Sequence, residues 1–228
     1  MNRDTSKLIP AVLLAALISG CQAVKPKDYS AFRSEDPRSI LVVPALNNST
    51  SVTAPDFFFS TVSQPFAERG YYVFPANMVK SVLEQNGLAD PGLVHNADPR
   101  RLDALFGCSA VLLITIEKWQ SQYVVLATTT TVQFEYIMKS CKTGATIWQD
   151  QRTMEYSPQA NSGGGNPLAA LVAQAIIAAI EKADPNYMPL TRQANLLAAS
   201  STGQGLPAGP YLADKYHKDM DQFPVGAR

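Results

Sequence analysis

Few residues in this chain of 228 could perform catalysis. The only two histidines, His95 and His217, lie far apart in segments with loop composition. The chain has no G-x-S-x-G nucleophile motif, no phosphate-binding G-x-x-x-x-G-K-[ST] loop, no H-E-x-x-H and no pair of C-x-x-C motifs. A Ser-His-Asp arrangement stays open, because such triads assemble only in space. These patterns favour a protein that is not an enzyme and that uses neither a metal nor a cofactor.

Carboxylates and aromatic residues recur along three segments of the second half of the chain. Glu117, Glu135 and Glu155 lie one on each segment and could form an acid–base pair. Their alternation with Thr and Gln is more typical of the solvated face of a sheet. An aromatic interaction patch is a second candidate site, with core and rim positions as the alternative for the same four residues, which are Trp119, Tyr123, Trp148 and Tyr156.

The first cysteine has a different chemistry. Residues 1–7 are short and polar, residues 8–18 are apolar apart from one proline, and the small residues Ser19 and Gly20 precede Cys21. This order is typical of a secretory signal, and the apolar run is too short to span a bilayer. The sequence Ile18-Ser19-Gly20-Cys21 resembles a bacterial lipobox, in which the cysteine sulfur is lipidated and the chain is cut before the cysteine.

Lipidation at Cys21 predicts a membrane-bound protein. A diacylglyceryl group and an N-acyl chain exceed the two signals that stable anchoring requires. Because Gln22 is not aspartate, the sorting rule of enteric bacteria favours the outer membrane, with the domain facing the periplasm. Removing residues 1–20 leaves 208 residues with a net charge of −1, since the signal holds two of the 19 basic and one of the 19 acidic residues. This balance gives no electrostatic footprint for nucleic acid.

The predicted elements define a mixed α/β fold of one domain. Residues 22–37 lack periodicity and indicate a tether after the lipidated cysteine, so that the expected divisions are a signal peptide (1–20), a lipidated tether (21–37), a periplasmic domain (38–200) and an irregular C-terminal tail (201–228). Apolar runs predict strands at 39–46 and 71–74, with helices at 57–69, 76–86 and 98–107. A strand, helix and strand in this order should pair in parallel with a right-handed crossover.

The second half of the chain predicts an antiparallel meander followed by helices. Its strands fall at 110–119, at 123–139, where apolar residues alternate, and after the turn at 142–144. Helices are expected at 167–183, with an apolar stripe too interrupted for a membrane span, and at 186–199. The whole is expected to be a mixed sheet, with a parallel β-α-β part, a three-stranded meander and helices packed on it.

Cys108 and Cys141 form a candidate disulfide in an oxidising compartment, and two separate buried thiols are the alternative. If segments 110–119 and 123–139 form a hairpin, the start of the first lies near the end of the second. The two sulfur atoms then meet at one end of the meander, although a shift of two or three residues in register would separate them.

Several fragments together resemble a family of proteobacterial lipoproteins, known as domain of unknown function family 799, which includes a neisserial lipoprotein antigen. The fragments are "ILVVPALNNST", "STVSQPFAERGYYVFPANMV", "EQNGL", "AVLLITIEKWQSQYVVL", "KTGATIW" and "LPAGPYLADKYHKD". The resemblance implies a fold like the N-terminal domain of TolB, with related domains in CsgG and LpoB. It also implies envelope partners, namely CsgG-like and small lipoproteins, and leaves a homo-oligomer open. The chain departs from the family pattern at Cys108 and Cys141, and a lineage-specific disulfide would explain both departures.

Two functions follow from these features. The first is a non-enzymatic, outer-membrane-anchored component of an envelope assembly or transport complex. The second is a regulator of a periplasmic enzyme such as a peptidoglycan synthase, which depends on the analogy with LpoB and on a tether long enough to reach across part of the periplasm. Fold analogy alone does not decide between them.

Overall fold

The computed structural model describes residues 24–124, 127–156 and 187–226. Their long strands form one mixed sheet with the order β3-β1-β4-β5-β6, and β2 pairs separately with β4. The strands are β1 (Ser39–Val42), β2 (Leu46–Asn47), β3 (Tyr72–Val73), β4 (Ala110–Val124), β5 (Ala127–Ser140) and β6 (Thr146–Tyr156). The described helices are α2 (Ser30–Glu35), α3 (Ala54–Glu68), α4 (Ala76–Gln85), α5 (Pro91–Asn96), α6 (Pro99–Phe106) and α8 (Met188–Ser200). The predicted helix at 167–183 lies outside the described residues.

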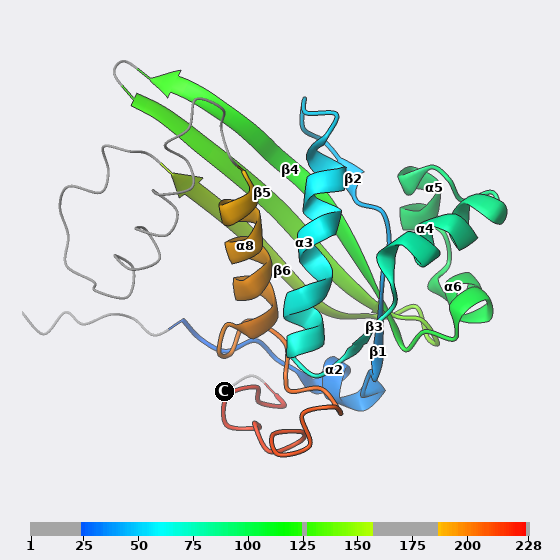
Figure 1. Ribbon diagram of the computed structural model, residues 1–228. Coiled ribbons are helices and arrows are strands. Elements are labelled where there is room, and N and C mark those ends of the chain that lie inside the picture. The colour runs from blue at the N-terminus through cyan, green and yellow to red at the C-terminus, as the bar shows by residue number, and fades with distance from the viewer. Residues whose placement is uncertain (1–23, 125–126, 157–186, 227–228) are drawn as a thin grey trace, which may run out of the picture.

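The topology agrees with the predicted fold class. β1 pairs in parallel with β3 and with β4, whereas β4, β5 and β6 pair antiparallel as a meander. Helix α3 connects β2 to β3, and α3 and α8 lie side by side across one face of the long strands (Figure 1). The predicted mixed sheet with a parallel part and a three-stranded meander is therefore confirmed.

Two apolar clusters explain why some strands are continuous apolar runs and others alternate. In β1, Ile40 and Val42 belong to the large cluster under α3 and α8, whereas Leu41 belongs to a second cluster formed with α4, α5 and α6. Because β1 is covered on both faces, all of its residues after Ser39 are apolar. In β5, Phe134 and Tyr136 are buried and Glu135 between them is exposed, because the described helices cover only one face there.

Helix ends follow the local sequence. Asp98 caps α6 by accepting a hydrogen bond from the Arg100 backbone N–H at 3.0 Å, and Pro99 occupies the first turn. Helix α3 ends at Glu68, and Gly70 follows with φ +89°, a left-handed conformation that glycine adopts cheaply.

Several predicted boundaries differ from the structure. The strand expected at 39–46 is split into β1 and β2, because Pro44 has no backbone N–H to continue the ladder. Tyr123 belongs to β4, whereas it was expected to begin the next strand. Helices α2 and α5 were not predicted, because each is only six residues long and too short to show an apolar period.

The described parts of the expected tether and tail, residues 24–37 and 201–226, belong to the folded domain. Tyr29 and Phe32 are buried in the large cluster, and α2 lies within the segment expected to be a tether. The C-terminal segment is irregular, as predicted, but it is packed: Leu206, Ala208 and Phe223 are buried. The folded part of the chain therefore begins by Lys27, well before residue 38.

Candidate functional site

A groove runs along the outer edge of the sheet, where β6 is the last strand. It is lined by Thr146–Gln151, which are six consecutive residues of β6, together with Lys27, Asp28 and Ala31 of the N-terminal segment and Glu135 of β5. Its volume is about 730 Å³. We call it the edge groove, and it is the larger of two grooves considered among the described residues.

Lys27 closes one side of the edge groove. Its Nζ donates hydrogen bonds to the Gln149 carbonyl at 2.7 Å, to Asp150 Oδ1 at 2.6 Å and to the Gln204 carbonyl at 3.0 Å. Burial lowers the pKa of Lys27, and the hydrogen bond that Lys27 donates to Asp150 opposes that effect. All three donors of the ammonium group are used. Lys27 therefore fastens the N-terminal segment to β6 and to the C-terminal segment and is not a free nucleophile.

Aromatic and ionic contacts complete this junction. The ammonium group of Lys27 lies 5.2 Å from the ring centre of Trp148, whose Nε1 donates to the Gln204 carbonyl at 3.0 Å. Arg152 forms an ion pair with the other carboxylate oxygen of Asp150. Removing either Lys27 or Arg152 would leave the buried carboxylate of Asp150 with fewer hydrogen-bond donors, so this cluster stabilises the position of β6.

A second groove of about 420 Å³ lies among β2, α3, α4 and α5, and we call it the helix groove. Its polar lining includes Asp56, Lys80, Glu84 and Asp90. Apolar side chains make up much of the remainder; they are those of Pro44, Leu46, Pro55, Phe59, Leu83, Leu88 and Pro91. An apolar cleft with a few charged groups is suited to binding a ligand. No histidine is among the residues that line it, so its acidic groups do not form a catalytic arrangement with one.

The two histidines have different partners. His95 Nε2 lies 3.0 Å from the carbonyl oxygen of Pro44, and burial lowers the pKa of His95. His217 lies in the C-terminal segment, with Nε2 3.3 Å from Asp36 Oδ1. Neither histidine contacts a serine or cysteine among the hydrogen bonds of the described residues.

The predicted aromatic patch is wrong for the three residues whose side chains are described. Trp119, Trp148 and Tyr156 are each 7% exposed or less and belong to the large cluster. Trp119 stacks on Tyr187, with ring centres 4.8 Å apart. Tyr123 lies in β4, and its side chain is outside the described part. The alternative interpretation, core positions, holds for these three residues.

Glu135 and Glu155 lie on the open face of the meander, and Glu117 lies at the irregularity of β4, where it has no register partner. Glu135 pairs in register with Thr115 on one side and Gln151 on the other, and Glu155 pairs with Thr131. Glu117 accepts hydrogen bonds from Asn48 Nδ2 at 3.2 and 3.3 Å. No two of these glutamates are register partners. Their positions agree with a solvated sheet face.

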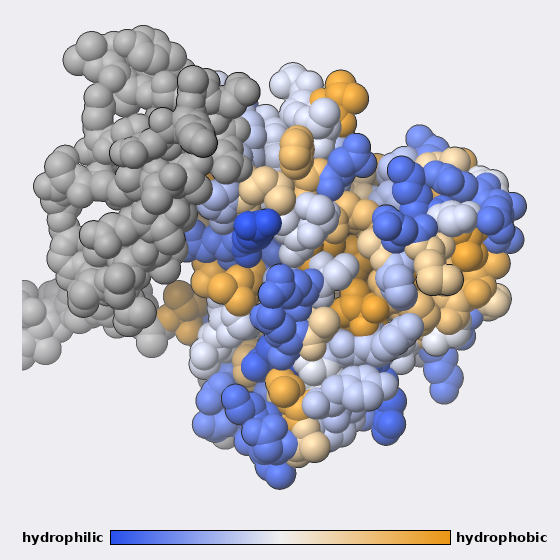
Figure 2. Space-filling model, viewed as in Figure 1, coloured by the Kyte–Doolittle hydropathy of each residue, from blue (hydrophilic) through white to orange (hydrophobic). Residues whose placement is uncertain are grey.

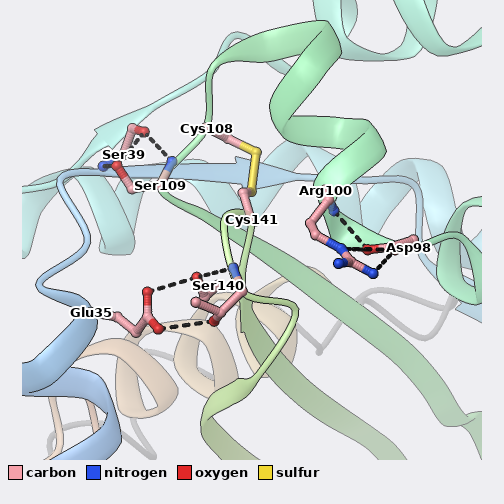
Figure 3. Close-up of a disulfide and its surroundings, with 9 residues drawn as sticks. Glu35, Ser39, Asp98, Arg100, Cys108, Ser109, Ser140 and Cys141 are labelled. Atoms are coloured by element: carbon pink, nitrogen blue, oxygen red, sulfur yellow. Dashed lines mark hydrogen bonds and ion pairs between the residues drawn. A yellow bond between two sulfur atoms is a disulfide. The ribbon is translucent and has the colours of Figure 1, made fainter.

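The structure brings Cys108 and Cys141 together (Figure 3). Their sulfur atoms are 2.06 Å apart and their Cα atoms 5.9 Å apart. Both cysteines are buried in the cluster under α4, α5 and α6. Next to them, Glu35 of α2 accepts hydrogen bonds from Ser140 Oγ at 2.8 Å and from Thr143 Oγ1 at 2.9 Å, so α2 is fixed to the β5–β6 turn.

The described residues contain neither a cluster that could hold a metal ion nor a helix that could cross a membrane. Within residues 24–124, 127–156 and 187–226, no group of three or more His, Cys, Asp or Glu side chains could hold a metal ion. No helix in those ranges has the length and apolar character needed to cross a bilayer. The lipobox residues Ile18, Ser19, Gly20 and Cys21 precede the described part of the chain.

The fold is a small mixed α/β domain. Near the edge strand β6, the N-terminal and C-terminal segments of the described chain are joined by hydrogen bonds. The chain belongs to the family described as "Putative lipoprotein GNA1162-like", whose model matches residues 27–211. The match begins at Lys27, whose side chain is hydrogen-bonded to β6 and to the C-terminal segment.

Similar proteins support this assignment. The chain is 31% identical over 214 residues to "Putative lipoprotein NMB1124/NMB1162" of Neisseria meningitidis serogroup B, which covers 92% of this chain and 99% of the relative. The crystal structure of lipoprotein GNA1162 from Neisseria meningitidis is 30% identical, covers 63% of this chain and 98% of that chain, and has a TM-score of 0.53. The LpoB C-terminal domain from Salmonella enterica is 16% identical with a TM-score of 0.38, covering 64% of this chain and 93% of that chain, and this likeness carries no functional weight.

Proposed function

We propose that the protein is a lipid-anchored lipoprotein of the bacterial outer membrane, facing the periplasm, and a non-enzymatic component of an envelope assembly. The lipobox at Ile18–Cys21 carries this proposal. Membership of a lipoprotein family supports the anchor. The two described grooves are lined by groups suited to binding, and no histidine, cysteine or serine is among their lining residues.

The anchor is tested by metabolic labelling with a fatty acid. Cys21→Ala should abolish the label and leave a precursor that the lipoprotein signal peptidase does not cut. Gln22→Asp is the matched control, because it should keep the label while moving the protein from the outer-membrane to the inner-membrane fraction. Label that persists in Cys21→Ala would contradict the anchor, and an unchanged distribution of Gln22→Asp would contradict the sorting rule.

The assembly role is tested in crosslinked envelopes. Affinity purification of the lipidated protein should recover other envelope proteins, and CsgG-like and small lipoproteins are the expected partners. The Cys21→Ala variant is the control, since it should lose partners that meet the protein at the membrane. Recovery of the monomer alone, from crosslinked and from mildly solubilised membranes, would contradict this role.

The alternative function, regulation of a peptidoglycan synthase or similar enzyme, depended on a long tether. The packed segment removes most of that reach, because only six residue steps separate Cys21 from Lys27, which corresponds to about 20 Å when fully extended. A synthase assay with and without the protein still separates the two functions, since an assembly component should leave the synthase rate unchanged.

A further inference from the structure

The two ends of the described chain are joined by hydrogen bonds. The backbone N–H of Lys27 donates to the Gly203 carbonyl at 2.9 Å, and that of Tyr29 donates to the Pro224 carbonyl at 3.0 Å. Two further bonds have the same effect: Gln204 Nε2 donates to the Lys25 carbonyl at 2.7 Å, and the Gly226 N–H donates to Asp28 Oδ1 at 2.8 Å. The C-terminal segment therefore lies directly beside the residues that lead to the anchor.

The length of chain before this junction limits how far it can be from the membrane. Lys25 is four residues after Cys21, and four residues span at most about 14 Å. The lipid chains on Cys21 must lie in the bilayer, which places the cysteine at headgroup level. The surface around Lys25 is consequently held within a short distance of the headgroups.

That surface is made of residues 24–28 and 201–226, and we call it the terminal surface. Its exposed apolar side chains are Val24, Tyr211, Met220 and Val225, which are between 43% and 75% exposed. Its exposed charges balance, since Lys25, Lys215 and Lys218 are matched by Asp28, Asp214 and Asp221. Figure 2 shows hydrophobic and hydrophilic residues mixed in the lower part of the molecule, where the C-terminal segment lies in Figure 1.

We propose that the terminal surface rests on the phospholipid headgroups of the leaflet that holds the Cys21 lipid. Tyrosine and small apolar side chains beside charged ones suit the boundary between headgroups and acyl chains. Because the charges balance, long-range attraction to anionic lipid is weak, and the contact depends on the anchor. This inference rests on the proposed lipid anchor and adds to it the face that meets the membrane.

The same contact sets the orientation of the domain. The C-terminal end of α3 joins the terminal surface, since Arg69 Nε donates to the Leu206 carbonyl at 2.7 Å and the Tyr211 N–H donates to the Gly70 carbonyl at 3.0 Å. Helix α3 has 15 residues, which is a length of about 22 Å. Val52, which is 90% exposed, lies two residues before Ala54, the first residue of this helix and its opposite end. The helix groove includes Pro55 and Asp56 at that end, so it is held away from the lipid.

A pair of matched labels tests the orientation. Val225→Cys and Val52→Cys each place one free thiol at an exposed valine, and the lipidated proteins are labelled with a thiol-reactive fluorophore without reductant, which preserves the Cys108–Cys141 bond. Each protein is reconstituted in vesicles of phosphatidylethanolamine and phosphatidylglycerol that contain a headgroup-linked quencher. The label at 225 should lose most of its fluorescence, and the label at 52 should keep most of it. Met220→Cys provides a second label on the terminal surface and should behave like Val225→Cys.

Flotation of the vesicles separates the two ways in which this idea can fail. Protein that does not float with the vesicles, and carries no fatty acid, overturns the anchor and the inference together. Protein that floats but shows equal quenching at 52 and 225, or stronger quenching at 52, overturns the inference alone. Strong quenching at 225 that disappears in the Cys21→Ala protein supports the dependence of the contact on the lipid.

Discussion

Reduction of the Cys108–Cys141 bond is expected to destabilise the domain by about 4 kcal/mol. The cysteines are 33 positions apart, so the bond closes a loop of 34 residues in the unfolded chain. The loop-entropy relation gives an entropy loss of about 13 cal/mol/K for such a loop, which is about 4 kcal/mol at 25 °C. Because Ala110 of β4 and Ser140 of β5 are register partners in the native sheet, the strand ends should stay together after reduction. The effect should therefore arise mainly in the unfolded state.

Urea unfolding of the mature chain measures this difference. Tryptophan fluorescence is a suitable signal, since Trp119 and Trp148 are both buried and become exposed on unfolding. With a slope of about 2 kcal/mol per molar urea, the reduced protein should unfold at a midpoint lower by about 2 M. The double variant Cys108→Ala/Cys141→Ala is the control, and its curve should not respond to reductant.

Two results would refute this reasoning. The first is an oxidised and a reduced protein that unfold at the same urea concentration. The second is the detection of free thiols at both Cys108 and Cys141, by mass spectrometry, in protein isolated without reduction. Either result would favour the alternative of two separate buried thiols.

Three further predictions concern buried polar groups and close packing. Tyr136→Phe should lower the free energy of unfolding by about 1–3 kcal/mol, because it leaves buried Asn195 Oδ1 without the hydroxyl donor at 2.8 Å. Urea unfolding should show that adding Asn195→Leu restores part of this loss, and simple additivity of the two effects would contradict the coupling. Gly209→Ala should loosen the C-terminal segment, since a Cβ there would lie 2.2 Å from the Gly70 carbonyl oxygen; limited proteolysis should then cut this segment faster, and an unchanged rate would count against the packing. Burial lowers the pKa of His95 below its ordinary value of 6.5, so the unfolded state binds more protons, and the free energy of unfolding should fall as the pH drops below 6.5. His95→Gln should reduce this dependence of stability on pH, and an identical pH profile would show that His95 does not cause it.

The strands that could be predicted are those with an unambiguous pattern. In β5, Val132, Phe134, Tyr136 and Met138 recur at every second residue, and this indicates both the strand and the face that it buries. The predicted hairpin is the reason that Cys108 and Cys141 could be expected at one end of the meander, whereas the register that brings them together is given by the structure. The fold class was therefore accessible from local patterns alone.

The aromatic residues show where alternation fails. Counting along β4 from Thr115 and Glu117 places Trp119 on the polar face. The register shifts between Ile116 and Lys118, where one extra residue interrupts the ladder. Trp119 consequently pairs with Val132 on the buried face. Nothing in the sequence marks this irregularity, so the face of Trp119 could not be predicted.

The N-terminal segment could not be placed because its contacts are with distant residues. Tyr29 Oη donates to the Gly205 carbonyl at 2.7 Å, and Arg33 Nη2 pairs with Asp219 Oδ1 at 2.6 Å. Each contact joins residues more than 170 positions apart, and the segment itself has no periodic apolar pattern. Composition alone made it resemble a linker.

The meeting of the two chain ends has a consequence for the order of folding. Tyr29, near the beginning of the described chain, packs edge-to-face on Phe223, with ring centres 5.2 Å apart, and Phe223 is supplied almost at the end. A chain that emerges from its amino end cannot complete this part of its core until nearly all of it has been delivered. Such long-range closure is also slow. During synthesis this part of the core therefore stays incomplete until Phe223 has left the ribosome.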